Sequence, residues 1–227
     1  MRRIVVIALS VMLALVVVIP MASAKPQSKA DTGQTIGKKV LGELGARWWT
    51  WALEEPTATN PLIGPPYTDG CEGPFPLKGR EVFFLAGTIS GEPVTRECTV
   101  PRKTWLFFPI VNTVELEPTG VKTEQELRQI VNNRLDQFLV DSTMFVTVDG
   151  EPLRVSIKKQ RADTPLFIVN LPEGNIFGVK PEPYEAVADG VWVLLHPLKE
   201  GEHTITFGGT FPNGGFSQDN TYIITVE

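Results

Sequence analysis

The chain is poor in the residues that many hydrolases and metalloenzymes need. Two histidines and two cysteines occur in 227 residues, whereas a zinc site takes three or four ligands that are usually His or Cys. A weak metal site formed by His196 and His203 on neighbouring strands is the one such alternative left open. No Gly-x-Ser-x-Gly motif occurs, which disfavours a serine hydrolase. The sequence therefore predicts neither a metal nor another cofactor.

Positive charge is scarce as well. The formal net charge is −5 at pH 7, and an acidic chain repels phosphate backbones, so we expect no nucleic-acid partner. Apolar runs long enough to approach the width of a bilayer are confined to the N-terminus. We therefore expect no membrane segment beyond it.

The N-terminus has the three parts of a secretory signal peptide. Arg2 and Arg3 precede an apolar run over residues 4–18, and Ala22-Ser23-Ala24 supplies small residues at the expected cleavage position. The alternative, an uncleaved membrane anchor, does not explain the small residues at positions 22–24. We predict a signal peptide at residues 1–24 and hence a soluble protein that is secreted or extracytoplasmic, in a periplasm or at a cell surface.

Two further regions follow. Residues 25–34 are polar and aperiodic, as in a flexible leader. Residues 35–227 are of a suitable length for a single β-rich globular domain. Cys71 and Cys98 lie in this domain without Cys-x-x-Cys spacing, so in an oxidising compartment they predict a disulfide. Closing a loop of roughly 28 residues would stabilise the fold by about 3–4 kcal/mol.

Two helices are expected. Apolar residues recur at three- and four-residue intervals from Ile36 to Trp51, and this helix should end before Pro56. Thr123 and Glu126 form a capping-box pattern ahead of a second apolar stripe. Between them, residues 56–79 are rich in proline and glycine and are expected to form an irregular loop over the core.

The remaining patterns are typical of β-strands. Asp149-Gly150 predicts a two-residue hairpin turn, and Pro109 predicts an edge position or a bulge in its strand. These runs predict a mainly β, α+β fold: an antiparallel immunoglobulin-like β-sandwich with two accessory helices. The expected strands lie at residues 81–88, 94–100, 105–111, 145–148, 153–157, 166–169, 191–195, 204–207 and 221–226.

The spacing Leu198-x-x-Gly201-x-His203 resembles the corner that precedes the penultimate strand of immunoglobulin-like domains. In that corner a Tyr side chain bonds back across the turn, and His203 stands in its place. The C-terminal segment LKEGEHTITFGGTF…TYIITV therefore resembles bacterial immunoglobulin-like extracellular domains. The resemblance implies a structural role for these three residues.

A second resemblance covers residues 48–112. Its elements include two tryptophans, Asn60-Pro61, Asp69-Gly70-Cys71, VFFLAGT, Arg96-Glu-Cys98-Thr-Val-Pro101 and LFFPIVN. This succession is similar to a family of secreted prokaryotic β-sandwich proteins with no assigned activity. The likeness implies an exported, disulfide-bonded, β-rich protein and implies no catalytic residue.

Three weaker signals concern ligands. Paired carboxylates could serve a glycosidase, and the candidates are Asp69 with Glu72, or a set before Trp192. Trp49 points away from the apolar stripe, so it either packs under the proline-rich loop or marks an interaction surface. Residues 213–220 are rich in oxygen ligands but lack EF-hand spacing, so a hairpin loop is preferred over a calcium site. The set before Trp192 consists of Glu182, Glu185 and Asp189.

The sequence thus predicts an exported protein with a non-enzymatic extracellular role in binding or structural support and no catalytic residue. Trp49, Asp69 and Glu72 are the candidate binding residues for an unknown extracellular ligand or protein. One alternative is a carbohydrate-active protein, either a glycan binder or a glycosidase. The other is a subunit of a cell-surface assembly that uses free sheet edges.

Overall fold

The computed structural model describes residues 37–63 and 70–227. The predicted signal peptide, the predicted leader and Asp69 lie outside the described residues. Within the described ranges the helices and strands, in chain order, are α1 Lys38–Leu53, β1 Cys71–Leu77, β2 Arg80–Leu85, β3 Val94–Val100, β4 Trp105–Pro118, α2 Glu124–Leu139, β5 Thr143–Val148, β6 Glu151–Pro152, α3 Ile157–Gln160, β7 Arg161–Asp163, β8 Phe167–Asn170, β9 Pro183–Leu195, β10 Gly201–Phe211, η1 Pro212–Gly214 and β11 Phe216–Val226.

The strands form two sheets. The first has the order β1-β2-β4-β9-β7, with β8 also paired to β9, and the second has the order β3-β11-β10-β5-β6. The chain is mainly β, as the sequence predicts. Most pairings are antiparallel, but β2 pairs with β4 and β3 pairs with β11 in parallel. The parallel β2–β4 pair follows from the chain path, since β3 lies between them in sequence and belongs to the other sheet.

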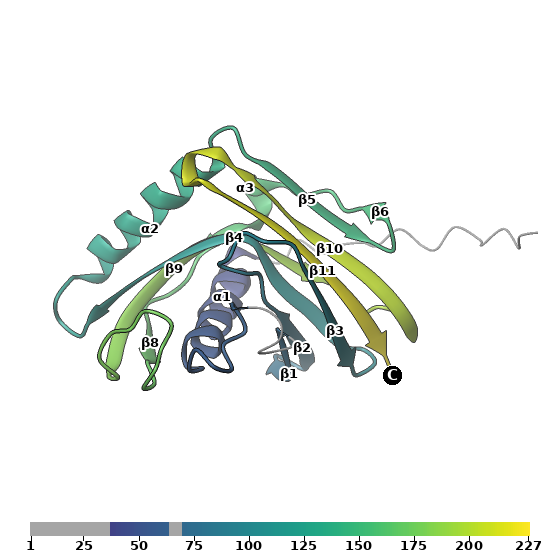
Figure 1. Ribbon diagram of the computed structural model, residues 1–227, viewed down its shortest axis with the longest axis horizontal. Helices are drawn as coiled ribbons and strands as arrows, with labels where there is room; N and C mark the ends of the chain where they lie inside the picture. Colours follow the sequence, from purple (N-terminus) through teal and green to yellow (C-terminus); the bar gives the residue numbers. More distant parts are fainter. Residues whose placement is uncertain (1–36, 64–69) are drawn as a thin grey trace, which may run out of the picture.

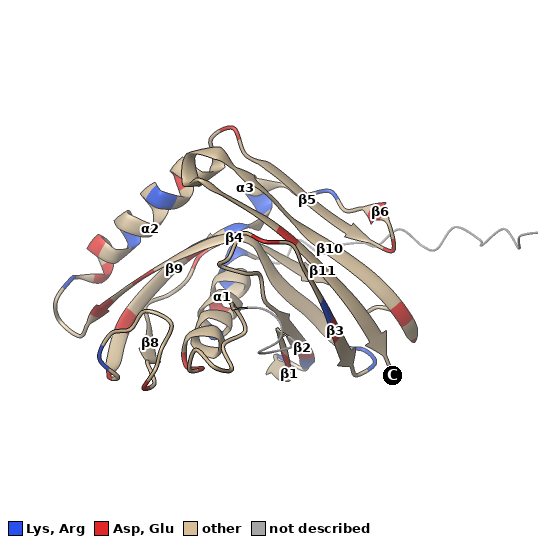
Figure 2. Cartoon of the chain, viewed as in Figure 1, with Lys and Arg blue, Asp and Glu red and all other residues tan. Residues whose placement is uncertain are grey.

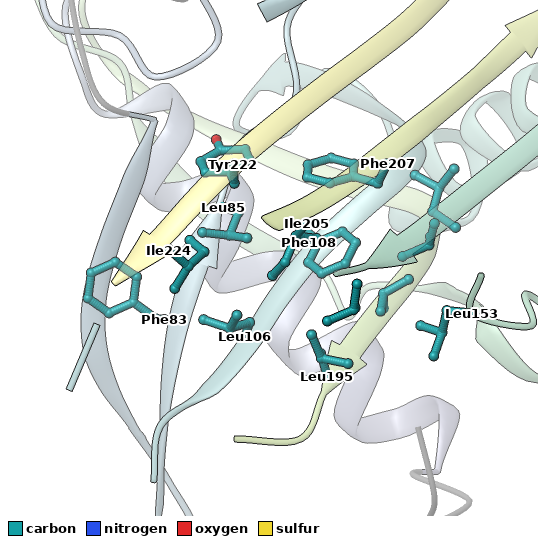
Figure 3. Close-up of a cluster of buried hydrophobic side chains, with 14 of the residues drawn as sticks. Phe83, Leu85, Leu106, Phe108, Leu153, Leu195, Ile205, Phe207, Tyr222 and Ile224 are labelled. Atoms are coloured by element: carbon teal, nitrogen blue, oxygen red, sulfur yellow. The ribbon is translucent and has the colours of Figure 1, made fainter. Parts of the chain in front are cut away.

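The two sheets pack face to face over an apolar core. Figure 3 shows Phe83, Leu85 and Phe108 of the first sheet facing Phe207 and Tyr222 of the second. The rings of Phe108 and Phe207 are 4.4 Å apart between centroids. Because alternate residues of a strand point to opposite faces, the neighbouring side chains of the first sheet face the other way. They form a second core beneath α1.

Helix α1 covers that other face, so the first sheet lies between α1 and the second sheet (Figure 1). Trp48 is fully buried there, and its indole nitrogen donates to the carbonyl of Leu85 at 2.9 Å. Gly42 lets the helix backbone approach β7, since a Cβ at this position would lie 2.3 Å from the carbonyl oxygen of Asp163. Glycine is unfavourable inside an isolated helix, and at Gly42 this close approach explains its presence.

Helix α2 packs against the outer part of the β4–β9 ribbon (Figure 1). Its predicted capping box is confirmed: the Thr123 side chain accepts from the Glu126 backbone, and the Glu126 carboxylate accepts from the Thr123 N–H at 2.8 Å. Leu127 and Val131 form a small buried cluster with Val187 of β9. In the described part of the chain, no helix is long and apolar enough to cross a membrane.

Several local predictions are confirmed. Pro109 lies at a register shift in β4 against β9, which accommodates the missing N–H in a central strand. Asp149 and Gly150 both have positive φ between β5 and β6, as a two-residue hairpin of this type requires. The predicted disulfide also forms: Cys71 at the start of β1 is bonded to Cys98 of β3. It joins the edge strands of the two sheets.

Other local predictions are wrong. Residues 71–77 form β1 instead of loop, and this strand tolerates Pro74 and Pro76 because it lies at the sheet edge. The expected strand at residues 153–157 does not form: the strand that returns from the hairpin, β6, covers only Glu151–Pro152, and the chain then continues to α3. Strand β9 begins at Pro183 instead of residue 191, so Glu185 and Asp189 belong to this strand.

Candidate functional site

A groove runs between the C-terminal half of α1 and strands β1 and β2. Its volume is about 440 Å³, which is in the range of small-molecule sites. We call it the α1–β1 groove. Helix α1 lies beside β1 and β2 (Figure 1, Figure 2), and these strands contribute Glu72, Phe75 and Phe84 to the lining. Its lining residues combine aromatic rings, carboxylates and one guanidinium: Arg47, Thr50, Trp51, Glu54, Glu55, Glu72, Phe75 and Phe84.

The position of the helix wall is fixed by buried contacts of α1. Trp48 anchors the middle of the helix to β2, as described above, and its ring contacts Trp192 of β9 at 6.0 Å. Asn60 then secures the end of the helix: its amide nitrogen donates to the carbonyls of Ala52 at 2.8 Å and Glu55 at 3.1 Å. Carbonyls at a helix end have no partner within the helix, so the fully buried Asn60 acts as a side-chain cap. Trp51 is thereby held at the edge of the groove.

The floor of the groove is a row of aromatic rings. The Trp51 ring lies 6.0 Å from that of Phe84, which in turn lies 4.6 Å from that of Phe75. Phe84 is buried, whereas Trp51 and Phe75 are half-buried. Because Phe84 contacts both neighbours, the row is rigidly packed, and the half-buried rings offer apolar surface to a ligand.

The carboxylates come from both walls. Glu54, at the end of α1, accepts hydrogen bonds from the backbone and side-chain nitrogens of Asn170 at 2.8 and 2.9 Å. Glu55 accepts from the Thr59 hydroxyl at 2.7 Å. Among the described residues no hydrogen bond or ion pair engages the carboxylate of Glu72, on β1. Two carboxylates are therefore oriented by neutral donors, while the third is exposed to solvent.

Arg47 supplies the one positive charge among the lining residues. Its guanidinium lies over the Phe75 ring, 5.5 Å from the centroid, and donates to the carbonyl of Pro76 at 2.8 Å. In the described ranges it makes no ion pair with Glu54, Glu55 or Glu72. The groove thus combines a net negative charge with aromatic faces, one of which already contacts a cation.

The three predicted binding residues do not form one site in the described part of the chain. Glu72 lines the groove, and Asp69 lies outside the described residues. Trp49 is 7% exposed and packs edge-on against Trp48, with 5.1 Å between ring centroids. Of the two alternatives for Trp49, burial is the one observed, and its ring offers no open face for stacking.

The acidic residues before Trp192 engage separate partners. Glu182 pairs with Lys180 at 2.6 Å, and Glu185 accepts from the Gly120 N–H at 3.3 Å. Asp189 is buried beneath α2 and accepts from Arg161 at 2.6 and 2.9 Å. Burial raises the pKa of Asp189, and the hydrogen bonds and charge of Arg161 oppose this rise. These three carboxylates therefore form no common site.

The histidines have structural surroundings. The His203 ring lies 2.9 Å from the Lys199 carbonyl through Nε2, across the turn, and 2.8 Å from the Asp149 carboxylate through Nδ1. Leu198 packs against the core between the sheets, and Gly201 has a positive φ at the start of β10. The His196 ring packs against that of Trp105 in a tilted arrangement, with 4.0 Å between centroids. Over residues 37–63 and 70–227, no group of three His, Cys, Asp or Glu side chains is placed to hold a metal ion.

Sequence reasoning missed most of the groove. The apolar stripe places Trp51 on the same helix face as Trp48 and predicts that both are buried, but Trp51 lies at the groove beside β1 and is only half-buried. Phe75 was assigned to an irregular loop. Adjacent acidic residues at the end of a helix with exposed aromatics are the one signal that could have suggested a site, since acidic side chains are unfavourable there.

Comparisons with known proteins add little. No protein-family model and no curated protein matches the chain. Two of the similar solved structures are the cysteine protease inhibitor EhICP2 from Entamoeba histolytica, at 13% identity and a TM-score of 0.24, and PbICP-C in complex with falcipain-2, at 14% identity and a TM-score of 0.23. The matches cover 64% and 63% of this chain and 96% of each of those chains. TM-scores this low carry no argument about fold or function.

Proposed function

We propose that the protein is an exported, non-enzymatic binding protein and that the α1–β1 groove is its recognition site. The observation that supports this proposal is the combination of half-buried aromatic rings and oriented carboxylates in one concave site. Ligand sites characteristically pair apolar surface with a few placed polar groups. The immunoglobulin-like topology and export belong to the same proposal, and the Cys71–Cys98 disulfide is compatible with an oxidising compartment.

The proposal is tested by a mixed fragment screen on ¹⁵N-labelled protein, followed by NMR. We expect at least one fragment to shift the indole signal of Trp51 and the backbone amide of Glu72 together. Its affinity should fall in both Trp51→Ala and Glu72→Gln, the second of which removes a charge without removing packing. Fragments that bind elsewhere, or no binding at all, would contradict the proposal.

A glycan-binding protein is the second candidate. It is favoured by the convergence of Trp51 with Glu54, Glu55 and Glu72 in the groove, because sugar sites combine aromatic faces with carboxylates that accept hydroxyl hydrogens. The residue expected to stack is now Trp51 instead of the buried Trp49. A glycan array probed with wild type and Trp51→Ala tests this candidate, and absence of binding by wild type would eliminate it.

The third possibility, a subunit of a cell-surface assembly, stays a prediction. Size-exclusion chromatography at high protein concentration tests it directly. A monomer at all concentrations would argue against self-assembly.

A further inference from the structure

We propose that the ligand of the α1–β1 groove is an organic cation, with an ammonium or guanidinium group carried on a carbon skeleton. This inference rests on the proposed function, because it names the ligand class of the same groove. Three features of the groove support it: uncompensated negative charge, aromatic faces, and a cation of the chain itself that already uses one of those faces.

The first feature is the charge of the lining. Three carboxylates face one guanidinium, and within the described ranges none of the three is part of an ion pair. Neutral donors hold Glu54 and Glu55, so their orientation is fixed while their charges remain available. The end of α1 lies at the same place and contributes the negative pole of its dipole. An anionic ligand would be repelled here, and a cation would be attracted.

The second feature is the ring surface beside these charges. Cations are attracted to the faces of aromatic rings, most strongly to Trp, within about 6 Å of the centroid. Trp51 and Phe75 are half-buried, so each offers part of a face together with apolar surface for a carbon skeleton. Aromatic faces next to carboxylates match an organic cation better than a bare metal ion, which prefers oxygen ligands.

The third feature is Arg47, which shows the contact that we expect of the ligand. Its guanidinium covers the Phe75 ring at 5.5 Å, so the ring demonstrably accepts a cation in this environment. Arg47 is one turn before Trp51 on the helix, and its hydrogen bond to Pro76 keeps it at one end of the groove. The Trp51 ring and the carboxylates of Glu54 and Glu72 are therefore the part left for the ligand.

The size of the groove limits the ligand to a small molecule or a single side chain. A volume of about 440 Å³ holds a choline-sized or agmatine-sized molecule with space for water. A long polymer would contact the groove through one residue at a time. We therefore test the chemistry with small probes.

The experiment is isothermal titration calorimetry of the full protein with choline and agmatine, and with dimethylbutanol, the uncharged carbon isostere of choline. At least one of the two cations should bind. If choline binds, dimethylbutanol should bind at least about tenfold more weakly, because it lacks the charge that the ring faces and carboxylates recognise. A neutral oligosaccharide mixture is titrated in parallel. Binding of the cation should weaken as salt is raised, as expected for a partly exposed charged site.

Variants then place the bound cation. Glu72→Gln should weaken binding by about fivefold, the effect of one partly exposed charge pair, and Trp51→Ala by about tenfold or more through loss of the ring. Matched controls come from the second sheet: Glu202→Gln removes an exposed carboxylate of β10, and Phe145→Ala removes an exposed ring of β5. Both controls should bind like wild type. Circular dichroism tests whether Trp51→Ala is folded. If it is not, the binding measured with Glu72→Gln decides whether the cation lies in the groove.

The outcomes separate this inference from the proposed function. If dimethylbutanol or an oligosaccharide binds in the groove as tightly as the cations, the groove is a binding site and the assignment to cations is overturned. If a cation binds but Glu72→Gln and Trp51→Ala leave its affinity unchanged, the assignment to this groove is overturned. If neither these probes nor any fragment binds the groove, both proposals fail.

Discussion

Arg96 and Tyr222 are joined by a buried hydrogen bond of 2.8 Å from the guanidinium Nη1 to the phenol oxygen. Both side chains belong to the second sheet and are almost completely buried. From there they reach the segment between α1 and β1: Arg96 donates to the carbonyl of Pro61 at 2.8 Å, and the Tyr222 hydroxyl lies 2.7 Å from the carbonyl of Gly70. In the described part of the chain no carboxylate pairs with Arg96, so its charge is satisfied mainly by carbonyl oxygens and this hydroxyl.

Removing the hydroxyl should therefore be costly. In Tyr222→Phe the ring remains, but the buried Arg96 guanidinium loses its hydroxyl acceptor in the closed core. The Ala86 N–H loses one of two acceptors and keeps the carbonyl of Gly70 at 2.8 Å. We expect the free energy of unfolding to fall by about 1.5–3 kcal/mol, the range for a hydrogen bond to a charged group. Urea denaturation followed by fluorescence measures the change.

Tyr184→Phe is the matched control. The Tyr184 ring is also buried, but its hydroxyl donates a longer hydrogen bond of 3.2 Å to the carbonyl of Lys180, which is a neutral acceptor. This variant should lose less than about 0.5–1 kcal/mol, as expected for one neutral hydrogen bond. Equal losses of unfolding free energy in both variants would show that the hydrogen bond with Arg96 stabilises the protein no more than a neutral one.

A second prediction concerns Gly42 in α1. On an exposed helix, replacing Gly by Ala stabilises by about 1 kcal/mol. Here the added methyl group would meet the backbone of Asp163, so Gly42→Ala should instead destabilise by about 1–3 kcal/mol through overpacking. Gly37→Ala, at the N-cap of the same helix, has open space and loses only the preference for glycine at an N-cap, so it should destabilise by less, about 0.5 kcal/mol. Thermal unfolding of both variants gives the comparison, and a stabilised Gly42→Ala would refute the close approach.

Local sequence signals predicted the structure well where they act within a few residues. The capping box at Thr123 and the turn at Asp149-Gly150 depend on adjacent backbone groups, and both formed as predicted. Strand β1 was missed because Pro74 and Pro76 argue against a strand, and the edge position that tolerates them depends on the order of strands in the sheet. That order is set by contacts distant in sequence.

The candidate site shows the same limit. The sequence pairs Glu72 with Asp69 as neighbouring carboxylates, but nothing in it indicates that Glu72 and Glu54 line the same groove. Helix periodicity places Trp51 on the buried face with Trp48, and Trp49 off that face, yet Trp49 is buried and Trp51 is half-buried at the groove. Periodicity gives one buried face of a helix and does not show where other segments cover its remaining faces or leave a groove.

A third prediction concerns the disulfide. Cys71 and Cys98 join edge strands of different sheets, so the bond limits separation of the sheets at that edge. The double variant Cys71→Ala and Cys98→Ala should lose about 3–4 kcal/mol, the value expected for opening a loop of this length. Urea unfolding of the variant and of wild type, with and without reductant, measures it. Reductant should destabilise wild type and leave the variant unchanged; a loss below about 1 kcal/mol would mean that packing alone holds this edge.

The last prediction concerns pH and the buried carboxyl of Asp189. Burial raises its pKa above the ordinary value of 3.8, against the opposing effect of Arg161. The folded protein therefore holds this proton more tightly than the unfolded chain does. The contribution of Asp189 to stability is complete below pH 3.8 and is lost as the pH rises through the raised pKa.

The variant Asp189→Asn cannot titrate at this position and serves as the reference. The free energy of unfolding of wild type minus that of Asp189→Asn, measured by urea titration at a series of pH values, should decline from acidic toward neutral pH. A difference that instead rises toward neutral pH would show that pairing with Arg161 outweighs burial in setting the pKa of Asp189.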